Sequence, residues 1–408
     1  MKPRLLLVGL VALVSLAAVA VVGTAGADSG GDGNNRSYEV WLIDQEDRFN
    51  AGAGTLHVFD GDELTDDAES AEPESIDLGL AVRQRCEAET GSTPSRPHML
   101  VFNGGDDDGP GGNTHAMIAY VASGHVAFLD AQTREPLDCI DVGAQAHAAW
   151  PTPDQEHLIV ANQNGKQLNR IATDYDNDVF TLESAATLDL ANCTTPSGAA
   201  CQDPALRPDN APICPRTTSD GAFTFVTLRG GGMFVVDHNA APMQIVAEYT
   251  HEHVDDNGCG EMEARGKMYV NSGAGLTMPT GPGDEPYGHD VYAVKLNRLS
   301  RTPQTTPNRP RAELVYTRDQ PPGAQVDAHA VSLTRNDRYL WWGDRSQNDV
   351  TVVDPRRDRV VGRFGLVNEH SADPAPDLFD LSPRGDYMFA SLRGPNPSSG
   401  HEAFGSTP

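Results

Sequence analysis

Two distant segments, residues 147–160 and 329–342, repeat one pattern, and this repeat constrains the fold more than any other feature of the sequence. In each segment a histidine is followed by threonine, by Asp or Asn, by leucine and by a further apolar residue, at matching positions. Each copy then passes through a polar turn into a second apolar run. A repeated supersecondary unit of this kind predicts a repeat architecture.

Weaker copies of the pattern occur at residues 117–129, 218–236, 265–270 and 381–390. They are short runs of β-branched and aromatic residues separated by Gly, Asn or Asp, which is typical of antiparallel strands joined by tight turns. No amphipathic helix of useful length is evident. The sequence therefore predicts an all-β protein.

A single twisted four-stranded sheet cannot bury both of its faces, whereas sheets stacked around an axis cover one another. With roughly 50 residues per unit, the chain predicts a seven-bladed β-propeller. The expected blades are 37–86, 87–146, 147–210, 211–257, 258–326, 327–374 and 375–408. The last blade is incomplete, since the sequence reaches Pro408 before a third strand, and we expect truncation at this end.

The N-terminus predicts export. Lys2 and Arg4 precede an apolar run that ends near Val22, and Ala25-Gly26-Ala27 offers small residues for cleavage before Asp28. This order is typical of a secretory signal peptide. We therefore expect a signal peptide at 1–27, a flexible linker at 28–36 and the propeller at 37–408, in the periplasm, at the cell surface or outside the cell. A retained membrane anchor is the alternative.

The formal net charge of −28 excludes nucleic acid as a natural partner. No later segment is apolar enough to span a membrane, and we expect a soluble monomer after cleavage.

Six cysteines and no C-x-x-C motif favour disulfides in an oxidising compartment. Cys193 and Cys201 bracket a short loop, and Cys214 and Cys259 hold the same place in neighbouring blades, so both pairs are predicted disulfides. A thiolate metal site that includes His253 is the less favoured alternative for the second pair.

The segments 158–165, 225–228, 267–271 and 349–354 resemble the YVTN-repeat proteins, a group similar to lactonase-like propellers and to the propeller domain of nitrous oxide reductase. The resemblance covers most of residues 98–393 and implies the architecture rather than an activity. The tetrapeptide Tyr-Val-Thr-Asn itself is absent, as is the cupredoxin domain of nitrous oxide reductase.

Histidines mark the place where chemistry is expected. His147 and His329 open the innermost strands of the two best copies, and His98 holds the same place in blade two. Three repeat-equivalent histidines converging on one mouth of the central channel are candidate ligands of copper or another divalent metal, with His253 nearby. The alternative is structural, because histidines at strand starts also join hydrogen-bond networks.

Two functions remain open. The first is a non-catalytic propeller that binds a small molecule, a protein or a cell-surface component. The second is a metal-dependent enzyme at the channel mouth, either a lactonase-type hydrolase or a copper-dependent oxidoreductase. No nucleophile elbow and no Ser/His/Asp triad is recognisable, so the catalytic residues are unknown.

Overall fold

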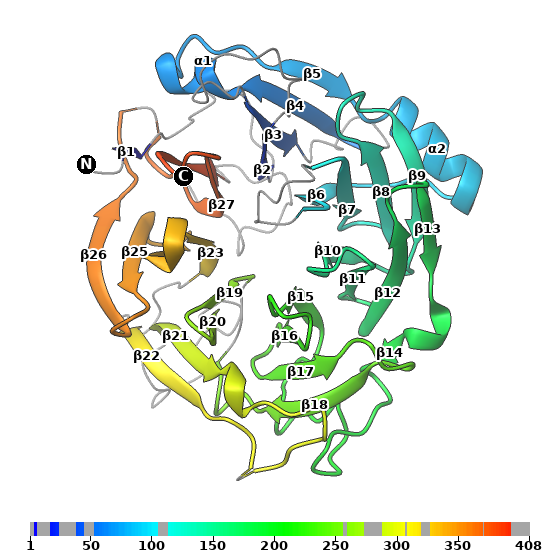
Figure 1. Cartoon of the computed structure of the whole chain (residues 1–408), viewed down its shortest axis with the longest axis vertical. Coiled ribbons are helices and arrows are strands. Elements are labelled where there is room, and N and C mark those ends of the chain that lie inside the picture. Colours follow the sequence, from blue (N-terminus) through cyan, green and yellow to red (C-terminus); the bar gives the residue numbers. More distant parts are fainter. Residues whose placement is uncertain are drawn as a thin grey trace.

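The computed structural model describes residues 4–5, 17–23, 38–44, 53–104, 113–255, 259–272, 288–306, 308–319, 327–369 and 371–392. These residues form seven sheets arranged in a ring, with the first and last sheets side by side (Figure 1). Each sheet is built mostly of strands that follow one another in sequence and pair antiparallel. The predicted β-propeller is confirmed.

In blades two to six the first strand lies innermost and the later strands lie successively outward (Figure 1). Blade two contains β6 (Pro97–Phe102), β7 (His115–Tyr120), β8 (His125–Asp130) and β9 (Pro136–Asp141). Blade three contains β10 (Ala146–Pro151), β11 (His157–Asn162), β12 (Gln167–Asp174), β13 (Val179–Leu182) and the short β14 (Leu188–Asp189). Blade four contains β15 (Pro212–Thr217), β16 (Thr224–Leu228), β17 (Met233–Asp237) and β18 (Gln244–Tyr249). Blade five contains β19 (Glu261–Ala264), β20 (Lys267–Ser272), β21 (Gly288–Lys295) and β22 (Ala312–Asp319). Blade six contains β23 (Ala328–Leu333), β24 (Leu340–Asp344), β25 (Asp349–Asp354) and β26 (Arg359–Gly365).

The seventh sheet is smaller than the others. It contains β27 (Pro376–Leu381), β28 (Tyr387–Leu392) and the two-residue β1 (Arg4–Leu5), which pairs parallel to β28. The ring nevertheless closes on blade one through an apolar cluster in which Tyr38 packs against Phe389, with ring centroids 6.2 Å apart. A cluster of buried apolar side chains likewise fills the interface between each other pair of neighbouring blades. Burial between sheets therefore stabilises the whole ring.

Blade one contains β3 (Tyr38–Asp44), β4 (Thr55–Asp60) and β5 (Glu74–Asp77), the three strands expected from the sequence. Its innermost strand is β2 (Ala17–Gly23), which pairs with β3 along its whole length. Both β1 and β2 fall within the predicted signal peptide, whereas Ala25–Ala27 and the linker 28–36 lie outside the described residues. Cleavage after Ala27 stays a prediction, and it would leave blade one with β3, β4 and β5.

Two short helices that the sequence did not predict interrupt the strands, one between β4 and β5 within blade one and one in the connection from blade one to blade two. The chain forms α1 (Gly61–Asp66) and α2 (Ala81–Thr90), while three single 3₁₀ turns lie elsewhere (Ser184–Ala186, Leu296–Arg298 and Arg335–Asp337). Helix α2 has little amphipathic character, since only Val82 and Cys86 are buried. Its stabilisation comes instead from the Cys86–Cys139 disulfide to β9 and from ion pairs four residues apart, Arg83–Glu87 and Arg85–Glu89. No described helix has the length and apolarity needed to cross a membrane.

The repeat pattern has a structural basis in the turn that follows each inner strand. The hydroxyl of Thr152 accepts a hydrogen bond from the backbone N–H of His157, and Thr218, Thr334 and Ser382 accept the same bond from the residue five positions later.

The adjacent tryptophans of β24, Trp341 and Trp342, point to opposite faces of the sheet of blade six. Trp342 packs between blades five and six, and Trp341 packs between blades six and seven.

Candidate functional site at the inner edge of the ring

The inner strands begin on one face of the ring, which we call the histidine face. In five of them the register of pairing shifts near the start of the strand. In each of these strands one residue of the bulge directly follows the first paired residue. These bulge residues are, in blade order, His98, His147, Ile213, His329 and Asp377. A β-bulge redirects a side chain relative to the regular pleat. The positions that the sequence repeat identified as equivalent therefore share one local backbone geometry, while the fifth-blade counterpart, near residue 258, lies outside the described residues.

Two of the three candidate histidines make the same contact. The ring nitrogen Nδ1 of His147 lies 2.9 Å from the backbone oxygen of Ile213, the bulge residue of blade four. Nδ1 of His329 lies 2.7 Å from the backbone oxygen of Asp377, the bulge residue of blade seven. A carbonyl oxygen can only accept, so Nδ1 carries the proton in both rings and Nε2 keeps its lone pair. Each histidine thus links its blade to the next one.

Both imidazoles are neutral at physiological pH. Burial, together with the nearby charges of Arg229 and Arg345, lowers the pKa of His147 to about 4, although the hydrogen bond to the Ile213 carbonyl opposes this shift. Burial also lowers the pKa of His329 to about 4, although the carboxylates of Asp377 and Asp327 oppose this shift. A neutral ring with a fixed tautomer can accept a hydrogen bond at Nε2 or bind a metal ion there.

His98 joins His147 at the same edge. Their ring centroids are 4.6 Å apart and the rings are inclined by 56°. The three histidines do not form a preformed three-ligand metal site. In the described part of the chain, only Cys214, Cys259 and Glu261 bring three His, Cys or carboxylate ligand atoms within 4.8 Å of one another.

His253 takes no part in this arrangement. Its Nδ1 lies 2.6 Å from the Thr250 hydroxyl in an exposed turn after β18. No described contact connects His253 to the other three histidines. The structure therefore shows His253 in a contact within its own turn and not as a fourth member of the histidine group.

An arginine that sequence reasoning missed lies beside His329. The guanidinium of Arg345, in the turn between β24 and β25, binds both oxygens of Asp327 at 2.6 and 2.8 Å. It also donates to Oδ1 of Asp377 at 2.6 Å, and that oxygen lies 3.6 Å from His329 Nδ1. Burial alone would lower the pKa of Arg345, but the two carboxylates outweigh it and raise the pKa further. Repeat equivalence already places Asp377, with Ile213 and Gly258, at the position corresponding to His147, whereas nothing in the sequence distinguishes Arg345 from other arginines.

The cysteines form three disulfides, and none is free. The structure joins Cys193 to Cys201 and Cys214 to Cys259, the two pairs expected from the sequence, with Cα atoms 5.3 and 5.4 Å apart. The Cys214 and Cys259 sulfurs are therefore bonded to each other and not available as thiolate ligands. Burial raises the pKa of the neighbouring Glu261 to about 8, so this carboxyl group is protonated at neutral pH.

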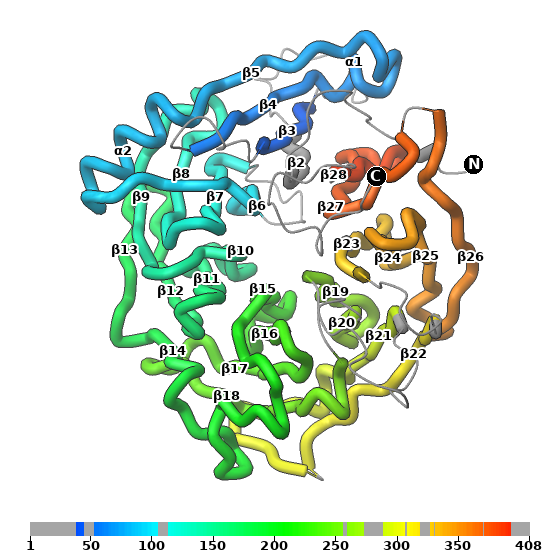
Figure 2. The backbone as a smooth tube through the Cα atoms, turned by 180° about the vertical axis from the view of Figure 1, so that it is seen from behind, coloured from blue at the N-terminus to red at the C-terminus, as the bar shows by residue number. Residues whose placement is uncertain are grey.

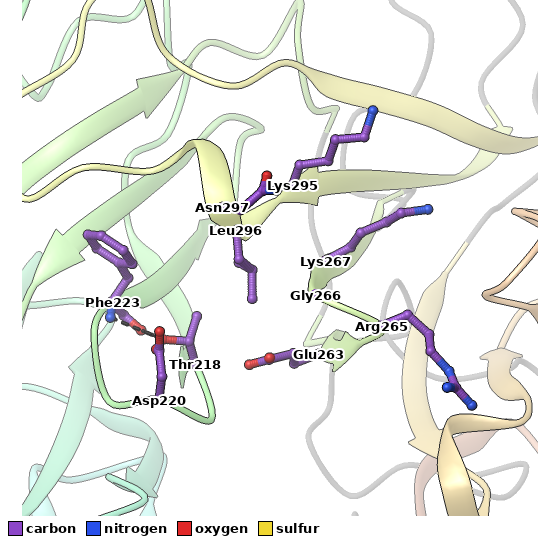
Figure 3. Close-up of a pocket in the computed structure, with 10 residues that line it drawn as sticks. All are labelled: Thr218, Asp220, Phe223, Glu263, Arg265, Gly266, Lys267, Lys295, Leu296 and Asn297. Atoms are coloured by element: carbon purple, nitrogen blue, oxygen red, sulfur yellow. Dashed lines mark hydrogen bonds between the residues drawn. The ribbon is translucent and has the colours of Figure 1, made fainter.

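A cavity of about 520 Å³ opens on the opposite face, between blades four and five (Figure 3). Its charged side chains already have partners: Glu263 accepts from Ser219, Lys267 pairs with Asp358, and Lys295 pairs with Glu313. In Figure 3 the charged ends of Arg265, Lys267 and Lys295 point away from Glu263, and the Leu296 side chain points into the space between Thr218 and Glu263.

The fold and this edge define a β-propeller with a polar inner rim. No protein-family model and no curated protein sequence matches the chain. Solved structures with the same fold include hydrazine synthase from Kuenenia stuttgartiensis, with a TM-score of 0.53, 12% identity, and coverage of 87% of this chain and 89% of that chain. The Cps50 (Swd1) β-propeller domain of Myceliophteria thermophila gives a TM-score of 0.52 at 9% identity, covering 85% of this chain and 90% of that chain.

A protein described as a putative 6-phosphogluconolactonase from Bacteroides uniformis is also similar. It gives a TM-score of 0.50 at 10% identity, covering 85% of this chain and 95% of that chain. At these identities the likeness shows the propeller fold alone. The narrower resemblance to YVTN-repeat proteins and to nitrous oxide reductase is not confirmed.

Proposed function

We propose that this protein is an extracytoplasmic binding propeller that holds a polar ligand at its inner edge, on the histidine face. The observation that carries this proposal is the pair of neutral imidazoles of His147 and His329, each fixed by a bond from Nδ1 to the bulge carbonyl of the next blade. The two Nε2 atoms then act as oriented acceptors for hydroxyl or amino groups of a ligand. Three disulfides are consistent with an oxidising compartment and support export.

A metal-dependent enzyme is the second candidate. A neutral histidine whose other ring nitrogen donates to a backbone carbonyl is the usual arrangement of a metal ligand, and His147 and His329 both have it. His98 would supply a third imidazole, which suits copper or zinc. The bound ion would polarise a substrate carbonyl or activate water, as lactone hydrolysis requires.

Replacing both His147 and His329 with alanine is expected to abolish binding at this edge. Thermal unfolding is followed in the presence of Cu²⁺, Zn²⁺ or a panel of sugars and sugar lactones, with lactone hydrolysis assayed in parallel. We expect at least one of these probes to raise the Tm of the unsubstituted protein by several degrees, and the double variant to lose the shift. Lactone turnover that disappears with the metal would favour the enzyme over the binding protein.

The matched control is His57→Ala. His57 lies on β4 and contacts Ser75 of the outermost strand of blade one, away from the inner edge of the ring, so this variant keeps the shift. A ligand-induced shift that survives in the double variant would place the binding site elsewhere. The absence of a shift with every probe would contradict the proposal itself.

A further inference from the structure

A second group of polar side chains lies in the interface between blades five and six. The apolar part of this interface includes Tyr269, Val291, Leu340, Trp342 and Val353. Side chains alternate between the two faces of a strand, and β20, β21, β24 and β25 pair regularly where they adjoin. The residues that point into the same interface nearer the histidine face are therefore Asn271, His289, Asp344, Thr351 and Asp349.

These five side chains carry buried polar atoms without a hydrogen-bond partner among the described residues. The atoms are Asn271 Oδ1, both ring nitrogens of His289, Asp344 Oδ2, Asp349 Oδ1 and Thr351 Oγ1. Buried polar groups in folded proteins are almost always hydrogen-bonded to protein, water or an ion. Six such atoms on two facing surfaces are more than one buried water, with two to four bonds, can satisfy.

The pair at the centre is His289 and Asp344. Both side chains are fully buried, and Nδ1 of His289 lies 4.0 Å from Oδ2 of Asp344, too far for a hydrogen bond. Burial lowers the pKa of His289 to about 3, so its ring is neutral and has a free lone pair. Burial raises the pKa of Asp344 to about 7, and the charges of Asp327 and Asp349 contribute to this shift.

The positive charges nearby are already paired. Arg345 binds Asp327 and Asp377, and Arg318 binds Oδ2 of Asp349, which leaves Oδ1 of that carboxylate available. No described arginine or lysine forms an ion pair with Asp344. Among the described residues, the interface therefore contains a buried carboxyl group without an arginine or lysine ion-pair partner.

Comparison with blade three shows what is particular to Asp344. Asn162 pairs with Ala146, the first residue of the inner strand of blade three, just as Asp344 pairs with Ala328, the first residue of the inner strand of blade six. Oδ1 of Asn162 accepts from two backbone N–H groups, and Oδ1 of Asp344 accepts from the equivalent two. The Asn162 amide donates to the Val142 carbonyl, whereas Asp344 has an oxygen in place of that donor. Blade six thus keeps the structural role of the residue and adds an acceptor that faces His289.

We propose that His289 and Asp344 bind a divalent transition-metal ion, Zn²⁺ or Mn²⁺, between blades five and six. Bonds of about 2.0–2.2 Å from such an ion to nitrogen and oxygen span the 4.0 Å that separates the two central ligand atoms. One imidazole with carboxylate oxygens suits these ions better than Ca²⁺, which takes only oxygen ligands. The ion gives a partner to Nδ1 of His289 and Oδ2 of Asp344, neutralises the Asp344 carboxylate and links two blades. This site lies apart from His98, His147 and His329 and goes beyond the proposed function.

The test compares the chelator-treated protein with its Asp344→Asn variant after dialysis against Zn²⁺ or Mn²⁺. The bound metal is counted by native mass spectrometry and elemental analysis, and Tm is measured at each metal concentration. We expect the unsubstituted protein to bind one more ion than the variant and to gain about 5 °C in Tm at saturation. The variant is expected to fold, because asparagine already serves at the equivalent position of blade three.

Three further variants make the result decisive. Asp237→Asn, which alters a carboxylate that accepts one backbone bond at the end of β17, keeps the ion. The His147→Ala/His329→Ala double variant also keeps it, so failure of the proposed function is distinguishable from failure of this inference. His289→Gln loses the ion and replaces Asp344→Asn in the comparison if the latter does not fold. Equal metal counts in the unsubstituted protein and in the Asp344 or His289 variant would overturn the proposal.

Discussion

Replacing Arg345 with alanine is expected to destabilise the protein by about 3–5 kcal/mol, because removing one partner of a buried ion pair leaves the opposite charge uncompensated. Arg345 binds both oxygens of Asp327 and one oxygen of Asp377, and its side chain is 8% exposed. Two carboxylates would lose their shared partner, and the bridge from blade six to blade seven would be lost. Equilibrium unfolding in urea measures the change.

The control for this prediction is Arg356→Ala. Arg356 also binds an aspartate, Asp354, but its side chain is 50% exposed. An exposed ion pair contributes little to stability because solvent screens it, so this variant is expected to unfold nearly as the unsubstituted protein does. Equal losses of stability in the two variants would show that the Arg345 network is not buried as described.

Removing the Cys214–Cys259 disulfide is expected to cost about 4 kcal/mol, because a longer cross-linked loop restricts the unfolded chain more. This bridge joins the inner strand of blade four to the segment just before the inner strand of blade five, across a sequence separation of 45 residues. Replacing both cysteines with alanine and measuring urea unfolding under non-reducing conditions tests the prediction.

The Cys193–Cys201 pair provides the comparison. Its sequence separation is 8 residues, within one loop of blade three, and the same entropy argument gives about 2.5 kcal/mol. Peptide mapping of the unreduced protein should recover Cys214 linked to Cys259. Free thiols at these positions, or a larger loss from the shorter loop, would contradict the account.

The sequence predicted the propeller and the equivalence of the inner-strand positions because both depend on local chemistry that is copied from blade to blade. Thr152 and Thr334 close the same turn, and His147 and His329 occupy the same bulge. The Cys214–Cys259 pair could be predicted for the same reason, since each cysteine follows an equivalent position.

Features found only once in the chain could not be predicted in this way. Helix α2 lacks an amphipathic pattern, and the pairing of Cys86 with Cys139 depends on where that helix lies. Arg345 gains its role from two aspartates on different segments, and His289 meets Asp344 only because two blades stack. Such contacts are set by packing between blades, and a single sequence carries no periodic signal for them.

The ring nitrogens of His147 and His329 test the central claim most directly. If both histidines occupy equivalent bulges and donate to the next blade, ¹⁵N NMR at pH 7 will show two neutral rings protonated at Nδ1. Since burial lowers the pKa of both to about 4, neither will gain a proton as the pH is lowered from 7 to 5.5. The NMR signals of the two rings are assigned by comparison with the His147→Ala and His329→Ala single variants. A ring protonated at Nε2 alone, or one that titrates with the ordinary pKa of about 6.5, would contradict the account.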